Sequence, residues 1–376
     1  MSCWRTPNIA WLLQTLGVGL VLVVLTDIFL TVLYARSGAS LLSDRLHKGG
    51  WRLFRGAALS LPRYKDGLLA YAGPVLLVST VFLWVVLLLL GFALIVWPAL
   101  GSAIQASSGG TATGFPAALY YAGFSLTTLG TGDIVPLSAP YRLLTVLMAA
   151  VGFSVLTLSL TFFTSVYSAL VRRNTFALGL HHRTLGTADA AVLLVHLGPG
   201  GDFSDARSEL TTMAEELINL YESHHFYAVL HYFHFEGNAY SLARMALLTL
   251  DTATLIRSAL DEEAYPSLVR STSVAALWGG GMQLLEGVAA TFLPHPQPER
   301  AEELERDTER EWRAHFEQAL EKLRAEGIAV VEDVEAGAEK YFALRRGWGP
   351  YVVAFAEYML YDWHEVAAQE TGTPPS

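Results

Sequence analysis

Three apolar segments in the first half of this chain are each long enough to cross a lipid bilayer. They occupy residues 9–34, 74–97 and 141–171. A helix needs about 20 apolar residues to cross the hydrocarbon core, and each segment has at least that many. A fourth apolar segment, residues 115–128, has only roughly 14 residues and is too short to cross. We therefore expect three transmembrane helices, with a segment between the second and third that enters the membrane and returns.

The charge of the chain predicts its orientation. Residues 1–183 carry about +8 and residues 184–376 about −18. Basic residues gather between the first two apolar segments: Arg36, Arg45, Lys48, Arg52, Arg55, Arg63 and Lys65. Loops rich in lysine and arginine stay in the cytoplasm. We therefore expect a multi-pass protein of the inner membrane, with its N-terminus outside and its acidic C-terminal half in the cytoplasm.

The same counts limit what the rest of the chain can do. An acidic cytoplasmic half argues against nucleic-acid binding, which needs a basic face. Cys3 is the single cysteine, so the sequence has neither a disulfide framework nor a cysteine metal site. No nucleophile constellation is visible, and we expect no enzymatic activity and no cofactor. Residues 43–61 alternate basic and apolar side chains, which is typical of an amphipathic helix on the inner leaflet.

The chemistry of the chain is carried by residues 127–133, which read Thr-Thr-Leu-Gly-Thr-Gly-Asp at the end of the short apolar segment. Glycine at alternate positions permits the unusual dihedral angles that turn successive carbonyls toward one axis. Dehydrated cations can be coordinated by such carbonyls. The segment predicts a cation filter with these coordinating residues: Thr128, Leu129, Gly130, Thr131 and Gly132.

The stretch YYAGFSLTTLGTGDIVP resembles the pore helix and filter of bacterial potassium channels of the two-transmembrane, single-pore-loop type, whose usual signature is TTxGYGD. The resemblance implies an outer helix, a pore helix, a filter and an inner helix within residues 67–173. It also implies a homotetramer in the lipid bilayer, with potassium as the permeant ion. Four residues would support the filter: Thr127, Asp133, Tyr120 and Tyr121.

One residue departs from that signature, because Thr131 stands where the family has an aromatic residue. In the family this ring packs against the pore-helix aromatics and holds the diameter of the filter. Two alternatives follow. Tyr120, Tyr121 or Phe124 fills the gap, or the filter is looser and discriminates weakly between potassium and sodium. The backbone carbonyl of Thr131 is available in both cases.

Two further residues are candidates within the membrane. Gly152 falls near the hinge glycine of the family's inner helix, but glycine also serves close helix packing. Asp27 lies inside the first apolar segment, where a carboxylate is a functional candidate. The alternative is a structural role, in which Asp27 bonds to a neighbouring helix or reaches toward the inner interface of the membrane.

The cytoplasmic half shows helical periodicity between proline and glycine breakers, which predicts an all-α domain. Residues 192–201 are the nearest candidate for a nucleotide-binding turn, but their glycine spacing is wrong, so we expect no nucleotide. Histidines cluster among aromatic residues, which favours packing over metal binding: His224, His225, His231 and His234, with Glu222 nearby. We expect no metal beyond the ions in the filter.

The sequence therefore predicts an all-α membrane protein with four parts. Residues 1–35 form an additional N-terminal transmembrane helix, residues 36–66 a basic linker, residues 67–173 the pore domain and residues 174–376 a helical cytoplasmic domain that assembles or gates the tetramer. The predicted function is passive potassium conduction. A weakly selective cation channel is one alternative, and a membrane-anchored signalling or scaffold protein with a degenerate pore is the other.

The orientation can be tested with Cys3. If the basic loop is cytoplasmic, Cys3 lies outside, and a membrane-impermeant thiol reagent should label it on intact cells. Labelling that appears only after permeabilisation would reverse the predicted orientation. A Cys3→Ser variant controls for reaction with other cellular proteins.

Overall fold

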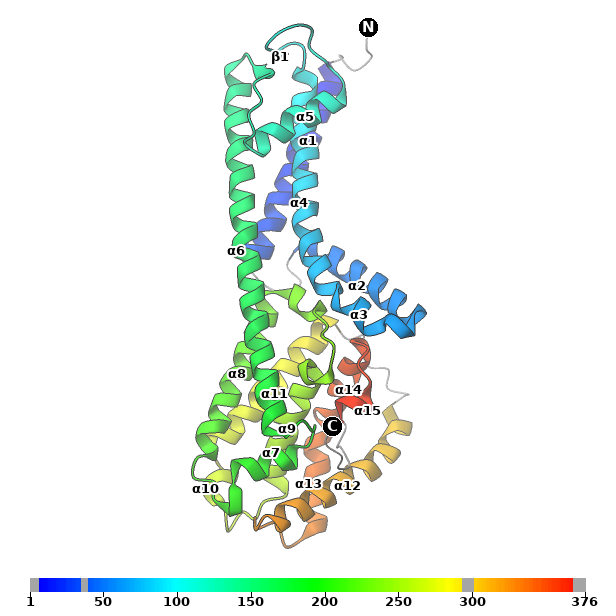
Figure 1. Cartoon of the computed structure of the whole chain (residues 1–376), viewed down its shortest axis with the longest axis vertical. Helices are drawn as coiled ribbons and strands as arrows, with labels where there is room; N and C mark the ends of the chain where they lie inside the picture. Colours follow the sequence, from blue (N-terminus) through cyan, green and yellow to red (C-terminus); the bar gives the residue numbers. More distant parts are fainter. Residues whose placement is uncertain (1–6, 35–39, 293–300, 368–376) are drawn as a thin grey trace. The chain divides into compact units, whose positions relative to one another are not determined.

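The computed structural model describes residues 7–34, 40–292 and 301–367. Cys3, Arg36 and the proline-rich breaker at residues 293–298 lie outside these ranges. The described chain is an all-α membrane protein, as expected (Figure 1). Its contacts divide it into two compact units. Unit 1 comprises Met1–Leu53, Ala72–Tyr167 and Tyr227–Tyr232, and unit 2 comprises Phe54–Tyr71, Ser168–Phe226 and Phe233–Ser376.

Unit 1 contains the membrane-spanning helices, the third of them only as far as Tyr167. Three helical stretches are long and apolar enough to cross a bilayer, which confirms the predicted number of spans: Asn8–Leu33, Ala72–Ala99 and Ala139–Arg183. The first is α1 (Pro7–Ile28) followed by the π-helical turn η2 (Phe29–Leu33), the second is α4 (Ala72–Val96) followed by η4 (Trp97–Ala99), and the third is α6 (Ala139–Arg183). The short helix α5 (Phe115–Leu126) has 12 residues, so it reaches only about 18 Å. It therefore cannot cross.

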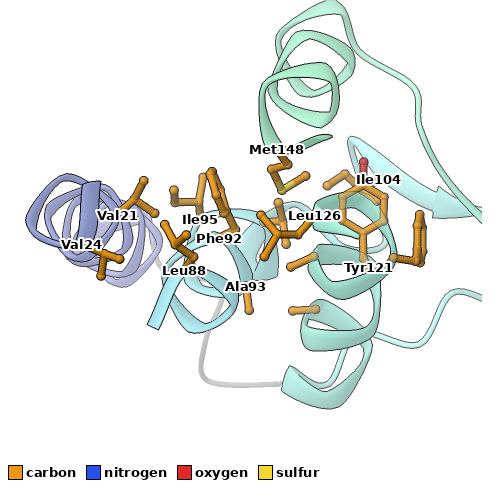
Figure 2. Close-up of a cluster of buried hydrophobic side chains, with 14 of the residues drawn as sticks. Val21, Val24, Leu88, Phe92, Ala93, Ile95, Ile104, Tyr121, Leu126 and Met148 are labelled. Carbon is orange, nitrogen blue, oxygen red and sulfur yellow. The ribbon is translucent and has the colours of Figure 1, made fainter. Parts of the chain in front are cut away.

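The first helix packs tightly on the second. A Cβ on Gly17 of α1 would lie 2.6 Å from the Gly91 carbonyl oxygen of α4, and a Cβ on Gly91 would lie 2.8 Å from Cγ2 of Val21. Glycine at both positions lets the two backbones approach closely, as small residues do in membrane helices. Figure 2 shows side chains of α1 and α4 in one apolar cluster with Tyr121 and Leu126 of α5. The N-terminal helix α1 is therefore part of the same core as α5.

The helix predicted at residues 43–61 is present as α2 (Ser43–Ser60). Its first half belongs to unit 1, where His47 Nε2 lies 2.8 Å from the Thr80 hydroxyl of α4. Burial lowers the pKa of His47 to about 4, so this histidine is neutral at pH 7. Trp51 is buried, and its ring lies 5.8 Å from that of Tyr232 in η6 (Ala228–Tyr232). Residues from late in the sequence therefore complete unit 1.

The third helix is longer than the apolar segment at residues 141–171. α6 continues to Arg183, and its 45 residues measure about 68 Å, more than twice the hydrocarbon thickness. Arg173 is buried in unit 2, where its guanidinium donates to the carbonyl oxygens of Phe233 (3.2 Å) and Tyr240 (3.1 Å). The arginine therefore serves packing of unit 2 instead of meeting the membrane surface.

Unit 2 is a helical bundle, which confirms the predicted all-α domain. Its central helix is α9 (Leu242–Ser258), in which every residue except Arg257 is buried. α9 packs against α7, α11, α13 and α14, and α8 packs against α11. The unit also contains these elements: η3 (Pro62–Tyr64), α3 (Lys65–Ala70), α7 (Ala190–Leu197), η5 (Pro199–Gly201), α8 (Ala206–Phe226), η7 (Asn238–Tyr240), α10 (Pro266–Val269), α11 (Thr272–Phe292), α12 (Ala301–Ala325), α13 (Val334–Arg346), α14 (Gly349–Tyr358) and α15 (Trp363–Val366).

The candidate nucleotide-binding segment at residues 192–201 forms α7 and the turn η5 instead of a strand and a phosphate-binding turn. Two histidines of the predicted cluster have packing roles in unit 2. His224 is buried and contacts the Leu220 carbonyl oxygen at 2.8 Å, and His234 stacks on Tyr361 with ring centroids 4.2 Å apart. Burial lowers the pKa of His224 to about 3. Within the described ranges, no three histidine, cysteine or carboxylate side chains are placed to hold a metal ion.

A buried ion-pair network joins the three helices α9, α12 and α13 of unit 2 at Asp251 of α9. The carboxylate accepts hydrogen bonds from Tyr341 Oη (2.7 Å), Arg345 Nη1 (3.0 Å) and His315 Nε2 (2.7 Å). The Arg345 guanidinium also lies 5.0 Å from the ring centroid of Trp348. Burial alone would raise the pKa of Asp251, but Arg345, His315 and the hydrogen bonds lower it to about 2.

Removing this carboxylate should destabilise unit 2 strongly. Asp251→Ala leaves the Arg345 charge buried without its partner, which costs about 3–5 kcal/mol. Because the folded-state pKa of Asp251 is depressed, its contribution is present above about pH 4 and is lost as the pH falls toward 2. The measurement is thermal unfolding of the purified full-length protein in detergent across this pH range.

The matched control is Glu335→Ala, which removes the carboxylate of an exposed pair with Arg313 and should change the melting temperature little. Equal melting temperatures for the two variants would contradict the role assigned to Asp251.

Candidate ion-conducting pore loop

The pore loop, residues 127–133, is held at both ends. It begins at the C-terminus of α5 and ends at β2 (Ile134–Pro136). β2 pairs antiparallel with β1 (Ile104–Ala106), with Gln105 opposite Val135. Just beyond β1, the Ser107 amide donates to the Asp133 carbonyl oxygen at 2.8 Å. The exit of the loop is therefore fixed to a segment that precedes the pore helix.

The backbone of the loop alternates in handedness. Thr128, Gly130 and Gly132 have φ values of 59°, 58° and 73°, whereas the intervening Leu129 and Thr131 do not have positive φ. A chain that alternates between left-handed and right-handed regions turns successive carbonyls to one side, while an extended strand turns them to opposite sides. This is the geometry expected from the glycine spacing. Thr128 adopts a conformation that non-glycine residues rarely take.

The start of the loop is anchored by one carbonyl of the pore helix. The Phe124 carbonyl oxygen accepts the amides of Leu129 (2.9 Å) and Gly130 (3.4 Å). The Thr127 hydroxyl donates to the Gly123 carbonyl oxygen at 2.8 Å. The C-terminal end of α5 carries the negative end of the helix dipole and has no basic residue in its last turn. The electrostatics at the start of the loop therefore favour a cation.

The predicted coordinating residues are all exposed in the single chain, and the Leu129 side chain is 70% exposed. Within the described ranges, no backbone amide outside the regular helices and strands donates to the carbonyls of residues 128–132.

Thr131 is bonded within the loop. Its hydroxyl donates to Asp133 Oδ1 at 2.5 Å. Hydrogen bonding from Thr131, and to a smaller extent from Tyr120, holds the pKa of Asp133 below its ordinary value. A hydrogen-bonded set of polar side chains therefore stands where the family has its aromatic signature residue. It consists of Tyr120, Thr131 and Asp133.

Tyr121 contacts α6. Its side chain is buried, and its hydroxyl lies 2.6 Å from the Thr145 hydroxyl of α6. Because the Thr145 hydroxyl donates to the Tyr141 carbonyl oxygen, Tyr121 is the donor in this pair. Sequence reasoning missed Thr145, since no local motif links residues of two different helices.

Gly152 allows a close contact between the inner helix and the pore helix. A Cβ at this position would lie 1.7 Å from the Leu126 carbonyl oxygen. The geometry gives this glycine a packing role at the C-terminus of α5. Only glycine fits without moving one of the two backbones.

Asp27 is fully buried and joins three helices of unit 1. Its Oδ1 accepts the amides of Leu41 and Leu42, both at 2.7 Å, and its Oδ2 accepts the Ser43 hydroxyl at 2.6 Å. The indole nitrogen of Trp84 in α4 donates to Oδ2 at 2.8 Å. The carboxylate therefore serves as a structural acceptor that fixes the start of α2 to α1 and α4, in agreement with the structural alternative.

Comparison with known proteins supports a membrane protein that contains an ion channel domain. Residues 83–169 match the model of a family described as "Ion channel". The uncharacterized membrane protein YdjJ of Bacillus subtilis (strain 168) is 29% identical over 245 residues, which cover 64% of this chain and 68% of that protein. No solved structure matches this chain. The family match includes α5, the pore loop and the part of α6 that contacts them.

Substitution of Gly152 tests the contact between the two helices. Gly152→Ala forces a backbone shift at Leu126, so we expect a loss of about 1–3 kcal/mol of stability and a lower melting temperature in detergent. The control is Gly179→Ala in the same helix, where an added Cβ meets no atom within 4 Å. That change should be neutral or stabilise the helix by up to about 1 kcal/mol. Unfolding at the same temperature in both variants would refute the close contact.

Proposed function

We propose that four copies of this chain form a potassium channel that conducts down the electrochemical gradient. The observation that carries this proposal is the alternating handedness of Thr128, Gly130 and Gly132, which leaves the loop carbonyls free to coordinate an ion. The match of residues 83–169 to an ion channel family supports it.

A tetramer is proposed because one loop lines only part of an ion path. The loop is exposed in the single chain, and backbone at membrane depth is tolerated where it lines a water-filled path. The resemblance to potassium channels implies that four loops meet around one axis. Potassium is then the permeant ion, and the protein needs neither a cofactor nor catalysis.

We further propose that the channel lies in the inner membrane, with the N-terminus outside and the helical C-terminal domain in the cytoplasm. The basic residues of α2 and its flanking segments support this orientation. The buried central helix α9 makes unit 2 a compact body suited to assembling or gating the tetramer.

A weakly selective cation channel is the second candidate, and Thr131 favours it. The Thr131 hydroxyl bonds to Asp133 of its own loop, so it does not brace the filter as a packed aromatic ring does in the resembled family. Reversal potentials in planar bilayers under mixed potassium and sodium distinguish the two candidates. A potential near the potassium equilibrium value supports selectivity, and a potential near zero supports the second candidate.

Conduction through the loop is tested by a pair of glycine substitutions. Gly130→Ala places a Cβ at φ 58°, which costs about 1–2 kcal/mol and turns the neighbouring carbonyls from the axis. We expect it to abolish rubidium uptake into liposomes that contain the purified protein. Gly109→Ala carries the same backbone penalty at φ 79° in an open loop before α5, and it should leave uptake unchanged.

Two results would contradict the proposal. Normal uptake in the Gly130→Ala protein would show that ions do not pass through this loop. No uptake by well-folded wild-type protein would favour a scaffold with a degenerate pore.

A further inference from the structure

The first half of α2 presents a basic and apolar surface away from unit 1. We call this surface, formed by Arg45, Lys48, Arg52 and Leu53 of α2 together with Leu41 just before the helix, the α2 outer face. Arg45 and Arg52 are exposed, and Lys48 is partly exposed although it pairs with Asp44. The Leu53 side chain is 76% exposed and that of Leu41 43%. Exposed leucines beside arginines are typical of helices that lie at a membrane surface.

The opposite face of the same helix is fixed within unit 1. Ser43 bonds to Asp27, His47 contacts Thr80, and Trp51 is buried beside Tyr232. These positions repeat every four residues and therefore share one side of the helix. At 100° per residue, Arg45 and Arg52 lie on the other side, so the contacts that hold α2 also determine which residues face outward.

The level of α2 relative to the membrane follows from its first turn. Its N-terminus bonds to Asp27, and Asp27 bonds to the indole of Trp84 in α4. A helix that begins beside buried polar groups of two spans, shortly after the first span ends at Leu33, lies at the boundary between hydrocarbon and headgroups. The α2 outer face therefore lies where lipid headgroups are always present.

We propose that the α2 outer face binds the headgroups of anionic phospholipids in the surrounding bilayer. Arginine guanidinium groups match phosphate oxygens in a two-pronged geometry, and the exposed leucines insert among the first acyl carbons. The occupant is bilayer lipid because the surface is continuous with the membrane spans and its charge is opposite to that of the lipid. This binding requires the membrane embedding of α1 and α4 and is independent of conduction.

The experiment uses the full-length protein in liposomes, with an environment-sensitive fluorophore at Leu53→Cys in a Cys3→Ser background. Brominated lipid is included either as anionic phosphatidylglycerol or as neutral phosphatidylcholine, at equal mole fraction. We expect both lipids to quench the fluorophore, and the anionic lipid to quench more. Each basic residue near an anionic surface strengthens the attraction to it about 5-fold. We therefore expect Arg45→Gln with Arg52→Gln to lower the anionic preference, the ratio of quenching by anionic lipid to quenching by neutral lipid, at least about 5-fold.

The matched control removes two exposed arginines of unit 2, Arg207→Gln with Arg310→Gln, and should keep the anionic preference. A fluorophore at residue 53 that neither lipid quenches would overturn the membrane contact. Equal quenching by both lipids in the protein with Arg45 and Arg52 intact would overturn the recognition of charge. Rubidium uptake is measured in the same liposomes, so that a failure of lipid binding can be distinguished from a failure of the proposed channel function.

Discussion

Backbone polar groups at membrane depth must be paired or face water, and the arrangement of unit 1 follows from this constraint. The spanning helices pair their backbone amides and carbonyls by hydrogen bonds within each helix; these helices are α1, α4 and α6. The short helix α5 does not cross, so its last carbonyls and the pore loop need other partners. The Phe124 carbonyl oxygen takes two amides of the loop, and the alternating handedness leaves the loop carbonyls free. A loop whose first amides are paired and whose carbonyls are free is suited to cations.

Features that depend on segment length and local spacing were predictable from the sequence. The three spans, α5 and α2 follow from apolar run lengths and periodicity, and the structure confirms them. The positive φ values at Gly130 and Gly132 follow from the placement of glycine at alternate positions. Local patterns were sufficient here because each of these features is determined by residues within one turn or one helix.

Features that depend on contacts between distant residues were not predictable in the same way. Arg173 is held inside unit 2 by two carbonyls that lie 60 and 67 residues further along the chain. The packing role of Gly152 depends on the position of Leu126, and the donors to Asp27 come from α2 and α4. In the sequence, Thr131 shows only that the aromatic ring of the resembled family is missing. Its hydrogen bond to Asp133 depends on how the loop folds and could not be read from the sequence. In each case the partner could not be identified until the helices were placed.

The order of chain synthesis has a consequence for how unit 1 is completed. Trp51 and His47 leave the ribosome early, but the ring of Tyr232 that covers them is made only after all three spans and α8. Residues Tyr227–Tyr232 belong to unit 1, while the residues on both sides of them belong to unit 2. A nascent chain truncated between α6 and η6 would insert its spans but leave Trp51 uncovered. Completion of the membrane unit therefore waits until translation has passed η6, when α8 of the helical unit has already been made.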